Sequence, residues 1–363
     1  MLVTAAGYVT NHVSRTGDHD AVLAFWVLLI SLLAYRLGKE EQPDKRIIYS
    51  IGFILSAAVL TKGVAAFFPL PFIFLWLAYK RKVLPILQNK HTWIAAFLCL
   101  TLASSYYVYS EISSPGFLNT LWFQEIGGRY TGENHGHNHS WYFYFIQLLS
   151  NDFTPWIYVL PLLAIKKIRI QINKYDDLVY YLLFAGFSIL IILSVSSTKC
   201  EWYSAPVFPL FALACGIILT ATANIIAHLF RTQTPFRLFA IKWILVAIVF
   251  CIPYKNTIKR ISFPQKEWVE NQYGEWLRKL APGQTISILT DRQPNYCVMY
   301  YVAALNAKNK SEFSIKNPAY KIKLNELIIC SDASEKFSKH FHYKEVDRYK
   351  QLELIRIESR IQH

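Results

Sequence analysis

Residues 122–156 have the sequence WFQEIGGRYTGENHGHNHSWYFYFIQLLSNDFTPW, in which a polar loop runs directly into an aromatic, membrane-type segment. The loop holds Glu125, Arg129 and three alternating histidines, and Trp141 and Tyr142 then open an apolar run. Tryptophan and tyrosine are enriched where membrane segments meet water. The stretch therefore predicts polar chemistry at a membrane surface.

Apolar segments of similar character recur along the chain. Of its 363 residues, 53% are hydrophobic and only 17% are charged, whereas soluble domains carry about 25% charged residues. A bilayer-spanning helix needs about 20 mostly apolar residues, and eight runs come close to that length: 21–37, 46–61, 63–79, 93–110, 141–165, 178–197, 203–227 and 238–254. We expect an α-helical polytopic membrane protein with about eight transmembrane helices.

The charges between these runs predict how the chain is oriented. Lysine and arginine are concentrated in the segments 38–46, 80–91, 166–177 and 228–237, which the positive-inside rule assigns to the cytoplasm. The remaining loops and everything after Tyr254 then lie outside. Because the net charge of +14 is explained largely by these loops, we do not expect nucleic-acid binding.

After Tyr254 the apolar content falls and charges become more frequent. We expect residues 1–254 to form the membrane region and 255–363 a small extracytoplasmic α/β domain. Its expected strands are 285–290, 326–331 and 352–357, and its expected helices are 265–280, 295–305 and 333–340. Cys297 and Cys330 could pair there as a disulfide if the domain is extracytoplasmic.

Three ionisable residues are candidates for a site on the outer face. Lys62 lies between two apolar runs, where an ionisable group costs about 2.5–3.5 kcal/mol to insert, and Lys199 is the only cation of the loop 198–203. Both lysines are predicted to bind an anion, which at that depth would be a lipid phosphate. Asp20 opens an apolar run, where the helix dipole alone favours an acid, so a structural and a catalytic role both fit.

The histidines of the opening stretch could bind a metal. Imidazole is the commonest nitrogen ligand for zinc and related metals, and alternation along an extended strand places His135, His137 and His139 on one side. Solvated loops can have the same composition, so both alternatives stay open. Glu125 and Glu133 are candidate oxygen ligands or bases.

Six motifs occur together in an informative order. They are GDHDAVLAFW at 17–26, the turn Thr61-Lys62-Gly63, the Trp–Glu–Arg loop at 122–129, H-x-x-x-W-Y-x-Y at 137–144, Pro155-Trp156, and S-x-x-K-x-x-x-Y at 196–203. In this order they resemble the polyprenyl-phosphate-sugar-dependent C-type glycosyltransferases, a family that includes protein O-mannosyltransferases and aminoarabinose lipid A transferases. The resemblance covers about residues 1–225.

The resemblance implies transfer of a sugar from a polyprenyl phosphate to an acceptor hydroxyl, with inversion. It assigns Lys62, Arg129 and Lys199 to the lipid phosphate, Asp20 to the second conserved acid of the site, and Tyr203 to the donor groove. From the residues themselves we also expect Glu125 to be catalytic like Asp20, and Trp141 and Tyr142 to bind substrate. His137 would lie near a metal and phosphate centre, where a divalent ion (Mg, Mn or Zn) could stabilise the departing phosphate. Besides membrane lipids, the expected partners are the lipid-linked sugar and an acceptor: lipid A, another glycan or a protein.

One departure from the family pattern limits this prediction. Relatives carry the principal catalytic acid in a D-E-x-x-Y context after their first transmembrane helix, and this sequence has no such segment. We therefore expect the N-terminal part of the enzyme to be missing and the chain alone to be inactive. The expected location is a bacterial inner membrane, with the site and the C-terminus in the periplasm. The alternatives are a metal transporter using the 135–139 histidines, and a polysaccharide polymerase or ligase.

Overall fold

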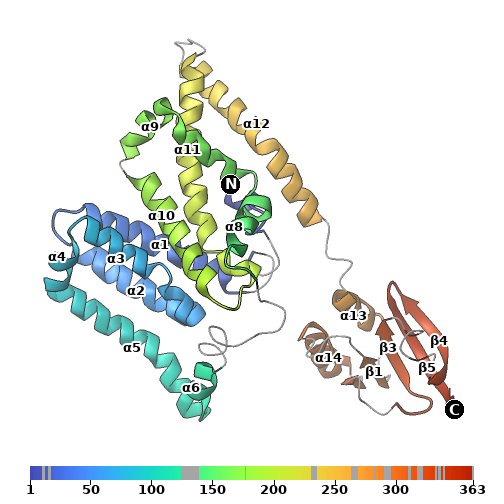
Figure 1. Cartoon of the computed structure of the whole chain (residues 1–363). Coiled ribbons are helices and arrows are strands. Elements are labelled where there is room, and N and C mark those ends of the chain that lie inside the picture. The colour runs from blue at the N-terminus through green and yellow to red at the C-terminus, as the bar shows by residue number, and fades with distance from the viewer. Residues whose placement is uncertain are drawn as a thin grey trace. The chain divides into compact units, whose positions relative to one another are not determined.

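The structure, a computed structural model, describes residues 1–9, 13–14, 18–123, 139–175, 177–229, 235–262, 269–280, 283, 285–289, 296–309, 312–316, 322–331, 333, 337 and 340–361. It divides into two compact units, Met1–Lys259 and Arg260–His363. The first is helical and the second contains a five-stranded sheet (Figure 1). The boundary predicted after Tyr254 falls inside helix α12 (Pro235–Ser262).

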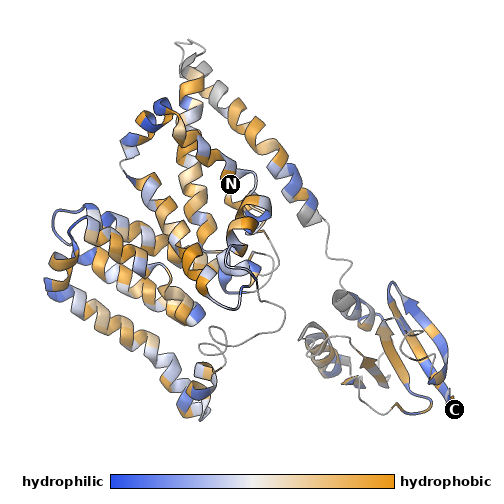
Figure 2. Ribbon diagram, in the orientation of Figure 1, coloured by the Kyte–Doolittle hydropathy of each residue, from blue (hydrophilic) through white to orange (hydrophobic). Residues whose placement is uncertain are grey.

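Five helices of the first unit are long and apolar enough to cross a membrane (Figure 2). They are α1 (Asp20–Lys39), α2 (Lys45–Lys62, continued by a 3-10 segment to Phe67), α5 (Lys90–Ser113), α10 (Leu178–Val195) and α11 (Val207–Leu229). Each coincides with one of the eight predicted spans. The prediction of a multi-pass membrane protein is confirmed, whereas the count of eight is not.

The predicted span 63–79 is interrupted. It consists of the 3-10 segment Gly63–Phe67 followed by α3 (Leu70–Tyr79), and α3 has only 10 residues, about 15 Å of helix. Pro69 and Pro71 explain the break, because proline offers no N–H to a preceding helical turn. The independent span predicted here is not confirmed.

The predicted span 141–165 is also irregular. It contains α8 (Phe143–Gln147), a π turn (Leu148–Asp152) and a 3-10 segment (Trp156–Ala164). Pro155 and Pro161 account for the missing α-helix, for the same reason as above. The eighth predicted span, 238–254, lies within α12. The short helices α4 (Val83–Gln88), α6 (Phe117–Thr120) and α9 (Lys166–Ile172) belong to the connections.

The core of the first unit lies where α1, α10 and α11 pack together. Gly186 lets α10 pack closely against α11, because a Cβ atom at this position would lie 2.3 Å from Cε1 of Phe211 in α11. Tyr181 crosses from α10 to α1 and donates its hydroxyl hydrogen to the carbonyl of Ser31 at 2.6 Å. These contacts hold the three helices in one register.

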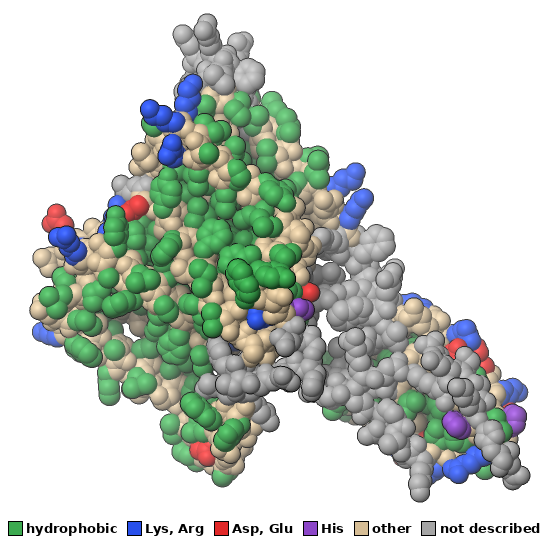
Figure 3. Space-filling view, in the orientation of Figure 1, with side chains coloured by type: hydrophobic (Ala, Val, Ile, Leu, Met, Phe, Trp, Pro, Cys, Tyr) green, Lys and Arg blue, Asp and Glu red, His purple; other side chains and the backbone are tan. Residues whose placement is uncertain are grey.

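Asp177 joins three helices at one end of the unit. Its carboxylate accepts hydrogen bonds from Lys80 at the end of α3, at 2.5 Å, and from Tyr35 of α1, at 3.1 Å, and Lys39 lies 3.4 Å away. Partial burial by itself raises the pKa of Asp177, but the hydrogen bonds from Lys80 and Tyr35 outweigh burial and lower it. Lysine and arginine side chains gather toward the edges of this unit, around a largely apolar face (Figure 3).

The second unit is a mixed sheet with the strand order β2-β1-β3-β5-β4. Its elements are α13 (Val269–Leu277), β1 (Thr285–Leu289), α14 (Tyr296–Asn309), β2 (Glu312–Lys316), β3 (Leu327–Ser331), β4 (Phe341–Tyr349) and β5 (Leu352–Arg360). Strand β1 runs parallel to β2 and β3, and β5 runs antiparallel to β3 and β4. The expected strands 285–290, 326–331 and 352–357 correspond to β1, β3 and β5, whereas β2 and β4 were missed.

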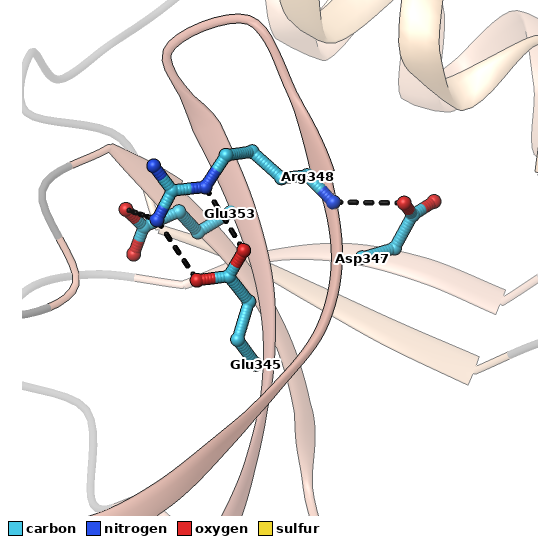
Figure 4. Close-up of polar contacts among 4 residues, drawn as sticks. All are labelled: Glu345, Asp347, Arg348 and Glu353. Carbon is cyan, nitrogen blue, oxygen red and sulfur yellow. Dashed lines mark hydrogen bonds and ion pairs between the residues drawn. The ribbon is translucent and has the colours of Figure 1, made fainter.

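Strand β4 was missed because most of its residues are polar and exposed. It lies at the edge of the sheet, where charged side chains prevent pairing with other chains. Arg348 of β4 binds both oxygens of Glu345, at 2.9 and 2.8 Å, and also reaches Glu353 of β5 at 2.9 Å (Figure 4). Cys330 is buried in β3, whereas the side chain of Cys297 lies outside the described residues, so the pairing of Cys297 with Cys330 stays a prediction.

Candidate active site

The clearest polar feature of the first unit is an ion pair between α1 and α2. Asp20 occupies the first turn of α1, where the helix dipole favours an acid, and Lys62 is the last residue of α2. Lys62 Nζ donates to Asp20 Oδ1 at 2.5 Å, and only 2% of Asp20 is exposed. Gly63 follows with a φ of 54°, a value that glycine adopts without strain. The positive φ lets the chain turn directly after Lys62.

This ion pair lies in the wall of a cavity of about 860 Å³, the first cavity. The ring of Tyr203 also lines it and has its centre 5.4 Å from Lys62 Nζ. The rest of the lining is mostly apolar or aromatic and includes Tyr106 and Tyr107 of α5. The first cavity therefore combines one neutralised pair of charges with aromatic faces.

Lys199 lines a second cavity, of about 690 Å³. It is 5% exposed, and its Nζ donates to the carbonyl oxygen of Ser196 at 2.6 Å. Trp141 and Phe145 also line the second cavity. Within the described part of the chain, no carboxylate forms an ion pair with Lys199.

The two cavities meet at Ser196, which lines both of them. Ser196 follows the end of α10, and its hydroxyl donates to the carbonyl of Thr198 at 3.2 Å. Ser196 is thus a wall residue that the two cavities share.

Most of the described site residues predicted from the sequence are brought together. Asp20, Lys62 and Tyr203 line the first cavity, and Trp141 and Lys199 line the second. Tyr142 was also predicted to bind substrate. It is 45% exposed, precedes α8 and lines neither of these two cavities.

Three predicted residues, Glu125, Arg129 and His137, lie outside the described residues, as does His135. His139 is described and stacks on Phe143 with ring centres 4.0 Å apart. Among the residues that the structure covers, no three His, Cys, Asp or Glu side chains come together as a metal site would require. These residues therefore do not supply a ligand set for a divalent ion.

Sequence reasoning missed the aromatic wall of the first cavity. Tyr106, Tyr107 and Phe117 come from the end of α5 and from α6. Two adjacent tyrosines near the outer end of an apolar run resemble an interfacial aromatic belt, so sequence alone gave no reason to place them in a site.

Comparison with known proteins supports the expected family. The model of the Alg9-like mannosyltransferase family matches residues 20–274. The fold is similar to ArnT from Cupriavidus metallidurans bound to undecaprenyl phosphate, with a TM-score of 0.62 and 13% identity over 98% of this chain and 77% of that one. Apo ArnT gives a TM-score of 0.58 and 12% identity over 97% and 76%. At such identities the similarity to ArnT shows the fold alone. A search of curated proteins found no match.

Proposed function

The chain belongs to the Alg9-like mannosyltransferase family of C-type glycosyltransferases, and we propose that it transfers a sugar from a polyprenyl-phosphate donor to an acceptor hydroxyl. Family membership and the five long apolar helices establish a membrane glycosyltransferase. The lipid-linked donor, the acceptor and the side of the membrane belong to the proposal.

One observation carries the proposed donor. Two cavities, one containing Lys62 and the other Lys199, meet at Ser196 beside the ends of α2 and α10. When a sugar leaves a lipid phosphate, negative charge accumulates on the phosphate, and a preorganised cation beside it stabilises that charge. The similar fold of ArnT, which is bound to undecaprenyl phosphate in one crystal structure, supports the same donor class.

The acceptor hydroxyl must lose a proton, and a carboxylate is the expected base. Asp20 and Glu125 are the predicted candidates. Because Oδ1 of Asp20 already accepts a hydrogen bond from Lys62, we assign Asp20 mainly to holding the Lys62 ammonium at the cavity wall. Glu125, from the loop predicted to lie on the same outer face, is then the stronger candidate for proton removal.

We place the reaction at the outer, periplasmic face of a bacterial inner membrane. The cation-rich connections predicted to be cytoplasmic include Lys39 and Lys80, which meet at Asp177. Helix α1 runs from Asp20 to Lys39, so the cavities and this cluster lie at opposite ends of a helix about 30 Å long. Lipid A, another glycan and a protein hydroxyl are the proposed acceptor classes.

Binding of the purified full chain to undecaprenyl phosphate and to undecaprenol tests the donor assignment. The two lipids differ only in the phosphate, so we expect affinity at least about tenfold higher for the phosphate, since charge-assisted hydrogen bonds are the stronger ones. The difference should shrink as salt is added. Equal affinity for the two lipids would contradict the proposed function.

A transfer assay examines the reaction itself and also tests the expectation that the chain alone is inactive. Membranes that contain the chain would be supplied with polyprenyl-phosphate mannose carrying a radiolabelled sugar, and the label would be followed into lipid, glycan and protein fractions. The labelled fraction identifies the acceptor class, and matched membranes without the chain are the control. The family favours this activity over the metal transporter and the polysaccharide polymerase or ligase.

A further inference from the structure

Lys62 and Lys199 differ in how their charge is balanced. Lys62 is paired with the carboxylate of Asp20, so the first cavity contains no net charge from this pair. Lys199 is more deeply buried, and among the residues that the structure describes its ammonium donates to a backbone carbonyl rather than to a carboxylate. The two lysines, both predicted to hold the phosphate, are therefore not equivalent.

The surroundings of Lys199 fit an anion. A buried charge is costly unless it is paired, and the carbonyl of Ser196 supplies only a partial charge. A lysine ammonium has three N–H donors, of which Ser196 takes one. No carboxylate among the described residues compensates this positive charge, which adjoins the second cavity, where a phosphate would compensate it.

The surroundings of Lys62 fit an uncharged ligand with hydroxyl groups. Asp20 supplies an acceptor and Lys62 a donor within one pair, and Tyr106, Tyr107 and Tyr203 supply aromatic faces to the same cavity. Ligand sites typically combine an apolar or aromatic lining with a few polar groups that fix orientation. A sugar ring has this character, with hydroxyl edges and apolar C–H faces.

From these observations we propose that the donor is divided between the two lysines: its phosphate binds at Lys199 and its sugar lies in the first cavity beside Asp20 and Lys62. This inference rests on the proposed function. In a polyprenyl-phosphate sugar the phosphate and sugar are directly bonded, so their sites must adjoin. Ser196 meets this requirement because it lines both cavities.

Two lipids distinguish phosphate binding at Lys199 from sugar binding beside Lys62. They are undecaprenyl phosphate, which has no sugar, and undecaprenyl-phosphate mannose. Lys199→Gln should weaken binding of both lipids by about tenfold or more, because truncating a buried charged partner typically costs that much. Lys199→Arg, which keeps the charge, should restore much of the affinity. Thermal unfolding of each variant checks that the chain is folded.

The paired substitution Asp20→Asn with Lys62→Gln removes both charges and leaves no lone buried ion. It should leave the affinity for undecaprenyl phosphate within about twofold and weaken that for undecaprenyl-phosphate mannose by about tenfold, since lost hydrogen bonds to a hydroxyl discriminate strongly. If the paired substitution weakened binding of both lipids equally, the division of the donor between the two lysines would be overturned. The proposed function would remain standing. A wild-type chain that bound neither lipid would overturn both.

Discussion

The ammonium of Lys62 and the carboxylate of Asp20 are 2.5 Å apart, with side-chain exposures of 24% and 3%. The residues are 42 positions apart in the chain, so the pair ties the last turn of α2 to the first turn of α1. Because the pair is buried, removing one of the two charges should affect stability differently from removing both.

Lys62→Met should therefore destabilise the chain more than Lys62→Met combined with Asp20→Asn. The single substitution leaves a buried carboxylate without its cation, which typically costs about 3–5 kcal/mol, whereas removing both charges is far milder. Thermal unfolding in detergent measures the difference. Lys39→Met is the matched control, because Lys39 and Asp177 are each about one-third exposed and such pairs contribute about 0–1 kcal/mol. A double variant less stable than the single one would contradict the ion pair.

Gly186→Ala should destabilise the packing of α10 on α11. The added Cβ would lie 2.3 Å from Cε1 of Phe211, and overpacking of a core costs about 1–3 kcal/mol. Gly216→Ala in α11 is the control, because nothing lies within 4 Å of a Cβ at that position. It should be neutral or stabilising by up to about 1 kcal/mol, as alanine favours helix. The same unfolding midpoint for both variants would rule out the close α10 and α11 contact.

Asp177 predicts a pH dependence of stability. Its pKa is lower in the folded chain than its ordinary value, so the carboxylate contributes stability above that ordinary pKa, about 3.9, and loses it as the pH falls through the folded value. Asp177→Asn should be less stable than wild type at pH 7, and the gap should narrow toward pH 3. Unfolding midpoints over this range provide the measurement, and a gap independent of pH would contradict the prediction.

The sequence allowed the long helices to be predicted because a bilayer requires long apolar runs. Two predicted spans are not continuous helices, since prolines at 69, 71, 155 and 161 break runs that hydropathy alone treats as continuous. Strand β4 was missed for the opposite reason, because an exposed edge strand has no apolar pattern to detect.

The sequence singled out residues that line the two cavities, but not their arrangement. Asp20, Lys62 and Lys199 are conspicuous as charged residues beside apolar runs, and Tyr203 was suggested by the family resemblance; their roles in a site stay predictions. Their pairing depends on how α1, α2 and α10 cross, which no local pattern encodes. For that reason the sequence could not indicate that Lys62 is neutralised by Asp20, whereas Lys199 has no carboxylate partner among the described residues.

The divalent-metal prediction centres on His137 and stays a prediction. If a metal binds there, the purified chain should take up Zn²⁺ or Mn²⁺ in calorimetric titration, and His137→Ala should weaken uptake more than His139→Ala, because the ring of His139 already stacks on Phe143. A chelator should reverse the uptake. Equal losses from the two variants would argue for a solvated histidine run without a defined site.

Helix α5 should control the shape of the first cavity through its contact with α2. A Cβ at Gly52 would lie 3.1 Å from the carbonyl oxygen of Ala95, and small residues of this kind let membrane helices approach closely. Gly52→Val should push α5 outward. Because α5 and the following α6 supply Tyr106, Tyr107 and Phe117 to the cavity wall, the displacement should weaken binding of undecaprenyl-phosphate mannose as well as lower the unfolding midpoint.

Phe53→Val is the matched control for Gly52→Val. Phe53 neighbours Gly52 on α2 but is 66% exposed, so its truncation should change neither the midpoint nor binding appreciably. Surface substitutions away from special features usually stay within about 0.5 kcal/mol. If Gly52→Val lowered the midpoint but left affinity for the mannose lipid unchanged, α5 would support the fold without shaping the cavity. If it changed neither, the close contact between α2 and α5 would itself be wrong.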